Sequence, residues 1–279
     1  MPLYWAAYGA DGDERLLMLH GGPGASHDYL LPQMLAPGDE RDLLFYDQRG
    51  GGRSRTGVDA PVTWQDHVDD LGSVVREFSL QPLSLVGYSW GALLALLYAA
   101  AAFEGNHLVR PARMVLIDPA PSTSGLRRQF EEEFARRQAS EPIRSMREEL
   151  QSSGLRERDM DAYRQRAFEL SVAGYFADPE RARDLTPFRV IGKVQQSVWE
   201  SLGEYDIAQK LRAVECPALV LHGREDPIPL ASSERVASAL RAELVVLADC
   251  GHVPYVERPE ELFTAVSRFL AATPQARNG

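Results

Sequence analysis

Short apolar runs alternate with longer stretches of helical periodicity along most of this chain. Helical spacing of apolar positions is clearest in Trp64–Phe78, where Thr63 provides an N-cap, and in Pro259–Ala271. The apolar runs predict β-strands at Tyr4–Tyr8, Leu16–Leu19, Leu43–Tyr46, Met114–Ile117, Ala218–Leu221 and Leu244–Leu247. Strands that alternate with helices form a mainly parallel sheet with helices on both faces, so the predicted fold class is α/β.

The alternation stops between residues 121 and 206. Segments such as QFEEEFARRQA and KVQQSVWESL in this region are charged, helical in period and poor in strand signals. A separate helical domain would also show this composition, but the strand pattern resumes afterwards at Ala218–Leu221. We therefore predict one core, formed by residues 1–120 and 207–279, into which residues 121–206 are inserted as a helical cap.

The composition is typical of an ordinary globular protein and argues against several classes of partner. Of the 279 residues, 44% are hydrophobic and 25% are charged, and the formal net charge is −10. Because Lys and Arg form no block, neither nucleic acid nor a membrane surface is an expected partner. The chain shows no leader-like segment and no apolar run of about 20 residues, so we expect a cytoplasmic protein.

The two cysteines, Cys216 and Cys250, are too few for a disulfide framework, and their spacing is not typical of metal ligands. We expect two free thiols in the core, no metal and no other cofactor. The sequence leaves the oligomeric state open.

The run LSLVGYSWGALLAL, from Leu83 to Leu96, has the pattern of a buried strand, a tight turn and a helix. Gly87, Ser89 and Gly91 match GxSxG within it. Small residues flank the serine of such an elbow because strand and helix pass close together, and the turn holds the hydroxyl clear of the sheet. GxSxG alone also fits an ordinary glycine turn, but the strand before it and the helix after it favour Ser89 as a nucleophile.

A serine nucleophile needs a histidine base and an acid that orients this base. Only His252 follows Ser89 and both candidate acids, Asp118 and Asp226, in the order Ser, Asp, His that accompanies this elbow. The histidines at 20 and 222 adjoin strand ends, and His67 lies on a predicted helix, where we expect it at the surface. The candidate bases are His20, His27, His67, His107, His222 and His252.

Two aspartates could orient the base. Asp118 and Asp226 each follow a predicted strand, and both loops open at the carboxyl edge of the sheet, where ligands bind in α/β folds. Asp226 precedes His252 by 26 residues (252 − 226), which leaves room for one helix and one strand. We therefore predict Asp226 as the acid, with Asp118 as the alternative.

The segment HGGPG, His20–Gly24, forms a loop with few side chains, and its glycines leave backbone N–H groups open to a ligand. An oxyanion hole needs such donors. We predict the N–H groups of Gly22 and of Trp90, the residue directly after Ser89, as its two donors.

The segment DQRGGGRS, Asp47–Ser54, contains three successive glycines. No GK[ST] follows them and no GxGxxG opens a helix, so a nucleotide site is not expected. We expect Asp47 and Arg49 to hold this loop in place by pairing locally.

Several segments spread over the core carry a family resemblance: HGGPG, DQRGGGRS, GYSWGA, HGREDP and CGHVPYVERPEEL. Together they resemble the proline iminopeptidase family of α/β-hydrolases, and HGGPGASHDYLL is also similar to the tricorn-interacting aminopeptidase branch of that family. The resemblance implies an α/β-hydrolase fold with an inserted cap. It also implies a cofactor-independent serine hydrolase that releases an N-terminal residue, often proline, from a short peptide.

Members of this family hold the free amine of the substrate with glutamates of the cap and loops. Trp199 and Glu200 resemble the family's Trp-Glu pair, which implies that Glu200 binds this amine, and Glu204 is a weaker candidate for the second glutamate. The alternative is a carboxylesterase or lactonase that acts on small esters with the same serine, aspartate and histidine. A non-catalytic binding protein with this fold would have no need for the three residues.

Overall fold

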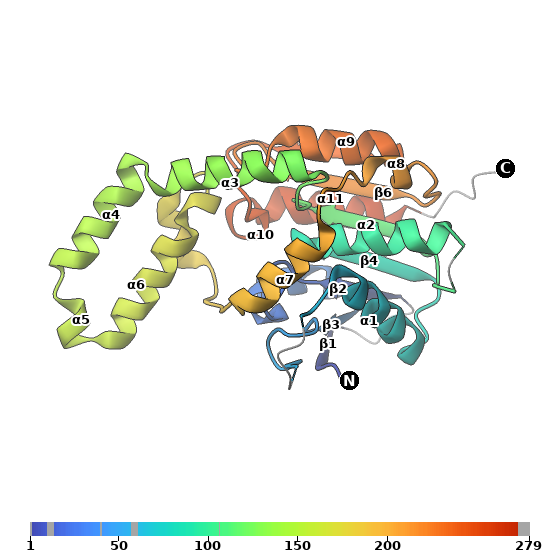
Figure 1. Cartoon of the computed structure of the whole chain (residues 1–279), viewed down its shortest axis with the longest axis horizontal. Helices are drawn as coiled ribbons and strands as arrows, with labels where there is room; N and C mark the ends of the chain where they lie inside the picture. The colour runs from blue at the N-terminus through green and yellow to red at the C-terminus, as the bar shows by residue number, and fades with distance from the viewer. Residues whose placement is uncertain (1, 10–13, 40, 57–60, 106, 273–279) are drawn as a thin grey trace.

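The computed structural model of this protein describes residues 2–9, 14–39, 41–56, 61–105 and 107–272. A seven-stranded sheet, in the order β1-β3-β2-β4-β5-β6-β7, runs through the centre of the molecule (Figure 1). β1 (Trp5–Gly9) pairs antiparallel with β3 (Asp42–Tyr46), and all other neighbouring strands are parallel. The other strands are β2 (Arg15–Leu19), β4 (Leu83–Tyr88), β5 (Pro111–Ile117), β6 (Ala218–Gly223) and β7 (Glu243–Leu247). Every predicted strand overlaps one of these, and the predicted α/β fold class is confirmed.

Side chains alternate between the two faces of the sheet, and both faces are covered. On β2, Leu17 faces the core that contains α1 (Trp64–Glu77) and α2 (Trp90–Phe103). Its neighbour Leu16 faces the opposite core, which contains α11 (Pro259–Ala271). Burial on both faces explains why the central strands are continuous apolar runs, without the alternation of a half-exposed strand. The other helical elements outside the β5–β6 connection are η1 (His27–Leu30), η2 (Gln33–Asp39), α9 (Leu230–Leu240) and α10 (Pro254–Glu257).

Helix α1 begins at the predicted N-cap. The Thr63 side chain accepts a hydrogen bond from the backbone N–H of Asp66, whose carboxylate in turn accepts one from the backbone N–H of Thr63. The prediction that His67 lies at the surface is wrong, because its side chain is fully buried and its ring meets Trp90 edge-on, with centroids 5.8 Å apart. His67 lies one helical turn before Leu71, so it shares the apolar face of α1.

All residues between β5 and β6 are described, and their regular elements are helical. The chain leaves and re-enters the core side by side, since Thr123 and Asp206 form an isolated antiparallel bridge. Figure 1 shows α4, α5 and α6 projecting away from the sheet, while α7 lies back against the core. The division into a core and a cap at 121 and 206 stays a prediction. The elements are α3 (Ser124–Gln138), α4 (Glu141–Ser152), α5 (Leu155–Arg158), α6 (Met160–Val172), η3 (Ala173–Tyr175), η4 (Pro179–Asp184), α7 (Gly192–Leu202) and α8 (Ala208–Leu211).

Cys216 and Cys250 are both buried in the core, as predicted. None of the helices in the described part of the chain is long and apolar enough to cross a membrane.

Candidate active site

Ser89 lies between β4 and α2 in a strained backbone conformation, with φ 54° and ψ −118°. Such a conformation is costly for a residue with a side chain and persists only where its surroundings hold it. Here the N–H of Ser89 donates to the carbonyl of Ile117 at 2.9 Å, and its own carbonyl accepts from Ala120 at 3.0 Å. These bonds attach the turn to the segment that leaves β5.

The glycines around Ser89 are required by close backbone contacts. A Cβ at Gly91 would lie 2.1 Å from the carbonyl oxygen of Leu19, and one at Gly87 would lie 2.6 Å from the Cα of Ala92. Neither backbone atom can move aside easily, so only glycine fits at these two positions. The two glycines of the GxSxG pattern are therefore required by the close approach of α2 to β4 and β2.

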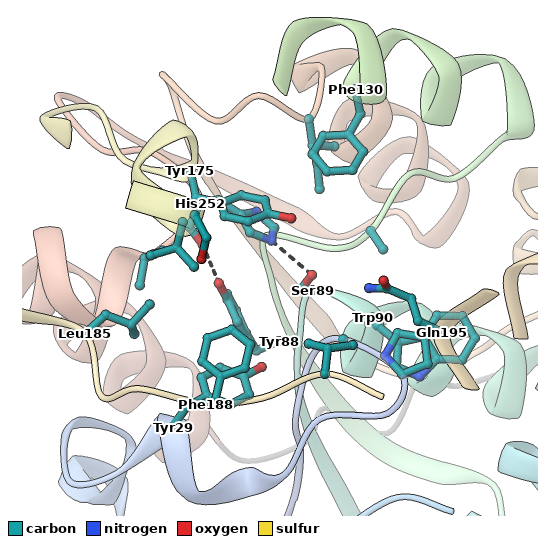
Figure 2. A pocket seen from close by; sticks show the side chains of 18 of the residues that line it. Tyr29, Tyr88, Ser89, Trp90, Phe130, Tyr175, Leu185, Phe188, Gln195 and His252 are labelled. Carbon is teal, nitrogen blue, oxygen red and sulfur yellow. Dashed lines mark hydrogen bonds between the residues drawn. The ribbon is translucent and has the colours of Figure 1, made fainter. Parts of the chain in front are cut away.

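Ser89, His252 and Asp226 form a continuous chain of hydrogen bonds. The Oγ of Ser89 lies 2.9 Å from Nε2 of His252, and Nδ1 of His252 lies 2.7 Å from Oδ2 of Asp226. Figure 2 shows Ser89 and His252 facing each other across the first of these bonds. Since an ionised carboxylate only accepts, Nδ1 carries the ring proton and Nε2 is free to take the proton of Ser89. The chemistry that this arrangement allows is activation of the serine hydroxyl as a nucleophile.

The backbone around the histidine holds its ring in place. The N–H of His252 donates to the carbonyl of Tyr175 at 2.7 Å, and the hydroxyl of Tyr88 donates to the carbonyl of His252 at 2.8 Å. Tyr88 is the residue before Ser89, so the loop that carries the histidine is tied directly to the serine elbow.

The structure places Asp226, and not Asp118, against the histidine. Burial disfavours the ionised form of Asp226, but attraction to His252 and the hydrogen bonds from His252 and Ile228 hold its pKa below the usual range. Asp118 instead accepts a bond from the N–H of Gly223 at 2.8 Å. Burial and repulsion from Asp226 raise the pKa of Asp118 well above its usual range.

The two residues predicted to supply the oxyanion donors belong to the same cavity wall as the serine. Gly22 and Trp90 both line the cavity into which Ser89 opens. Trp90 is the first residue of α2, where a backbone N–H has no acceptor within the helix. Gly22 has a φ of +59°, which favours glycine. Their role as donors to a reaction intermediate stays a prediction.

A buried network that was not predicted joins these two donor segments. The side-chain amide of Gln48 donates to the carbonyl of His20 at 2.7 Å and accepts from the indole N–H of Trp90 at 2.8 Å. The N–H of Gln48 also donates to Nε2 of His20 at 3.0 Å. Burial lowers the pKa of His20 to about 4, so the ring stays neutral in this acceptor role. The glutamine of DQRGGGRS was the available sequence signal, and its partners became visible only in three dimensions.

Replacing Gln48 by leucine is expected to lower both stability and activity. The His20 carbonyl and the Trp90 indole N–H would lose their partners in a buried place, at a cost of about 1–3 kcal/mol for each unpaired group. The free energy of unfolding from denaturant titration and kcat should both fall. The matched control is Gln151→Leu at the exposed end of α4. Equal stabilities for the two variants would contradict a structural role for this network.

Asp47 and Arg49 are both hydrogen-bonded, but some of their partners lie outside the loop Asp47–Ser54, where we predicted them. Asp47 accepts from Nδ1 of His27 at 2.7 Å and from the N–H of Arg53 at 2.8 Å. Arg49 reaches Asp70 on α1 through two hydrogen bonds of 2.8 and 2.6 Å. The local pairing prediction is therefore wrong for Arg49, since helix α1 passes close to the loop.

Ser89 and His252 open into a cavity of about 370 Å³ that is also lined by residues of the helical stretch between β5 and β6. Among the described residues that line it there is no Asp, Glu, Lys or Arg. Burial raises the pKa of Tyr175 to about 12, so this hydroxyl is neutral as well. Figure 2 shows the amide of Gln195 pointing across the cavity toward Ser89. Many of the large side chains in the walls are aromatic, among them Tyr29, Tyr88, Phe130, Phe168, Tyr175 and Phe188.

The structure does not bring the predicted amine-binding glutamates to this cavity. Glu200 is exposed on α7 and accepts a hydrogen bond from Gln196 at 2.7 Å, whereas its neighbour Trp199 lines the cavity. Successive residues of a helix point about 100° apart, so the turn that directs Trp199 inward carries Glu200 away. Glu204 is also exposed and is paired with Arg128 at 2.9 Å. These positions give no support to a role of either glutamate in binding an amine.

One group of side chains has the composition of a metal site. One potential ligand atom from each of Asp118, Asp226 and His252 lies within 4.8 Å of the others. However, His252 is engaged with Ser89 and Asp226, and both oxygens of Asp226 accept hydrogen bonds, from His252 and from Ile228. Only Oδ2 of Asp118 remains without a hydrogen-bond partner among the described residues, and a single oxygen does not make a cation site.

Three features define the class of α/β-hydrolases, and this structure has all of them. The sheet is mostly parallel, a strained serine elbow follows a central strand, and later loops carry a hydrogen-bonded histidine and aspartate. The model of the alpha/beta hydrolase family matches residues 16–265 of this chain, which therefore belongs to that family.

Relatives with known names confirm the resemblance drawn from the motifs. A proline iminopeptidase of Lactobacillus crispatus is 26% identical over 280 residues, covering 91% of this chain and 89% of the relative. The proline iminopeptidase structure from Mycobacterium smegmatis superposes with a TM-score of 0.68 at 20% identity, over 96% of this chain and 94% of that one. The enol-lactonase structure from Burkholderia xenovorans gives a TM-score of 0.66 at 20% identity, over 97% and 96%. The two structures show the shared fold and come from proteins named for different substrates.

Proposed function

We propose that this protein is a serine hydrolase that cleaves small acyl substrates through an acyl-enzyme on Ser89. The observation that carries the proposal is the hydrogen-bonded chain from Ser89 through His252 to Asp226. The backbone N–H groups of Gly22 and Trp90 serve as oxyanion donors, each worth about 3 kcal/mol in the transition state.

The proposed reaction has two halves. First, Oγ of Ser89 attacks the carbonyl carbon while its proton passes to Nε2 of His252, and the leaving group departs with that proton. Water then attacks the acyl-enzyme and gives a proton to His252, which returns it to Ser89 as the acid is released. Asp226 stays ionised and stabilises the positive ring that forms in each half.

We further propose a neutral ester or lactone with an apolar or aromatic acyl group as the preferred substrate. A substrate that carries an ammonium group would leave water for a cavity without a carboxylate, which is costly for an unpaired charge. The amide of Gln195 can bind a neutral polar group of the substrate.

A second candidate is a prolyl aminopeptidase acting on short peptides. It is favoured by relatives that match about nine-tenths of this chain and are named proline iminopeptidases. The apolar cavity would hold a proline ring. A cytoplasmic location, and the lack of nucleic-acid and membrane partners, stay predictions from the sequence.

A substrate panel separates the two candidates. We expect p-nitrophenyl esters to be hydrolysed, and N-blocked prolyl and alanyl anilides to be turned over no more slowly than the free-amine forms. An aminopeptidase would instead require the free amine, since its selectivity comes from binding the charged group. A strong preference for the free-amine prolyl anilide would overturn the ester proposal.

Gln195→Glu tests the neutral cavity directly. A carboxylate at this position is expected to raise kcat/KM for a free-amine prolyl anilide by about 10-fold relative to its N-blocked form, through a charge-assisted hydrogen bond. The matched control on the same helix is Glu200→Gln, for which we expect no change on either substrate. A loss of free-amine activity in Glu200→Gln would instead restore this glutamate as the amine anchor.

A further inference from the structure

Asp118 is a fully buried carboxyl group that the proposed mechanism does not use. It follows β5 in the sheet and has a positive φ of 41°. Its Oδ1 accepts a hydrogen bond from the N–H of Gly223 at 2.8 Å. Its Oδ2 is buried and has no hydrogen-bond partner among the described residues. An ionised oxygen in such a place would be costly, so this atom requires an explanation.

The carboxyl groups of Asp118 and Asp226 lie together behind the histidine. One oxygen of each is within 4.8 Å of the other and of a ring nitrogen of His252. Two carboxylates this close in a buried place repel each other strongly, so one of them takes up a proton. As both oxygens of Asp226 already accept hydrogen bonds, from His252 at 2.7 Å and Ile228 at 2.7 Å, Asp226 is the ionised partner.

We propose that Asp118 carries a proton on Oδ2 and donates it in a hydrogen bond to the Asp226 carboxylate, which makes Asp118 a positioning residue for the Ser89, His252 and Asp226 chain. The bond would fix the orientation of Asp226 and draw negative charge away from the oxygen that faces His252. The presence of the proton does not depend on the proposed function, whereas its effect on turnover rests on it.

Several other titratable groups lie near Asp118, but none of the described residues donates a hydrogen bond to its Oδ2. His222 lies 3.6 Å from Oδ1 through the same Nδ1 that contacts Ser233 at 2.9 Å, and burial lowers its pKa, which keeps the ring neutral. Burial also raises the pKa of the Cys250 thiol, which therefore keeps its proton and donates to the carbonyl of Gly251 at 3.5 Å. Asp118 also interacts electrostatically with Glu257, Tyr88 and Tyr255.

The first test is infrared spectroscopy of the whole protein at neutral pH. The difference between wild type and Asp118→Asn should contain the carbonyl band of a protonated carboxylic acid, which shifts in D₂O. The same difference should appear in a Ser89→Ala background. Because this readout needs no turnover, it separates failure of the proton assignment from failure of the serine hydrolase proposal. A difference spectrum without this band would overturn the inference.

The second test is the pH profile of kcat/KM. Asp118→Asn keeps a neutral donor next to Asp226, so the acid limb should not move and kcat should stay within about 3-fold of wild type. Asp118→Ala removes the donor, and the fuller charge on Asp226 should move the acid limb to higher pH and lower kcat about 10-fold. If Asp118 were ionised, either variant would remove a negative charge beside His252 and move the acid limb to lower pH, which would contradict the proposal.

Discussion

Replacement of Ser89 by alanine is expected to abolish hydrolysis of every substrate while leaving the fold intact. The change removes the nucleophile, and loss of this member of such a unit lowers kcat by about 10⁴-fold or more. Ser89 is only half-buried and its Oγ contacts His252 at the cavity wall, so the free energy of unfolding should change little. Turnover of a p-nitrophenyl ester and denaturant unfolding would measure the two effects.

The matched control for Ser89→Ala is Ser171→Ala. Ser171 lines the same cavity, but its hydroxyl donates to the carbonyl of Phe168 and is not part of the chain to His252. This variant should retain hydrolysis. A fluorophosphonate should label Ser89 in the wild type and fail to label Ser89→Ala. A rate near that of the wild type in Ser89→Ala would end the serine hydrolase proposal.

His252→Ala and Asp226→Asn are each expected to lower kcat by several orders of magnitude, about 10⁴-fold for the aspartate. Without the imidazole, Ser89 Oγ has no other base as a hydrogen-bond partner in the described part of the chain. In Asp226→Asn, the new amide would place a donor next to Nδ1 and favour the tautomer with a proton on Nε2, which cannot accept the proton of Ser89. Steady-state kinetics on one ester would measure both losses.

A control variant and the pH dependence of the rate test the roles of His252 and Asp226. His107→Ala, a change at an exposed histidine that does not line the cavity, serves as the control and should leave kcat unchanged. In the wild type, the rate should fall as the pH drops through about 6–7, because an imidazole base works only in its neutral form. A rate that is flat across this range, or a greater loss in Asp118→Asn than in Asp226→Asn, would contradict the assigned roles.

The sequence alone determined the features that depend on neighbouring residues and on period. The apolar runs predicted every strand of the sheet, and the central strands gave the clearest signal because burial on both faces requires continuous apolar segments. Gly87 and Gly91 indicated the serine elbow. Only glycine fits at these positions, because a Cβ would lie 2.6 and 2.1 Å from neighbouring backbone atoms. The order of Ser89, Asp226 and His252 predicted the grouping that the structure shows.

Tertiary structure decided everything that depends on which side chains meet across the sheet and the cap. Asp118 and Asp226 follow the neighbouring strands β5 and β6 at the carboxyl edge of the sheet, and only the packing of the His252 loop shows which of them the ring contacts. The orientation of α7 about its own axis places Glu200 at the surface and Gln195 in the cavity. A linear pattern specifies the period of an element but not its rotation against distant partners, because that rotation is set by contacts between segments far apart in the chain.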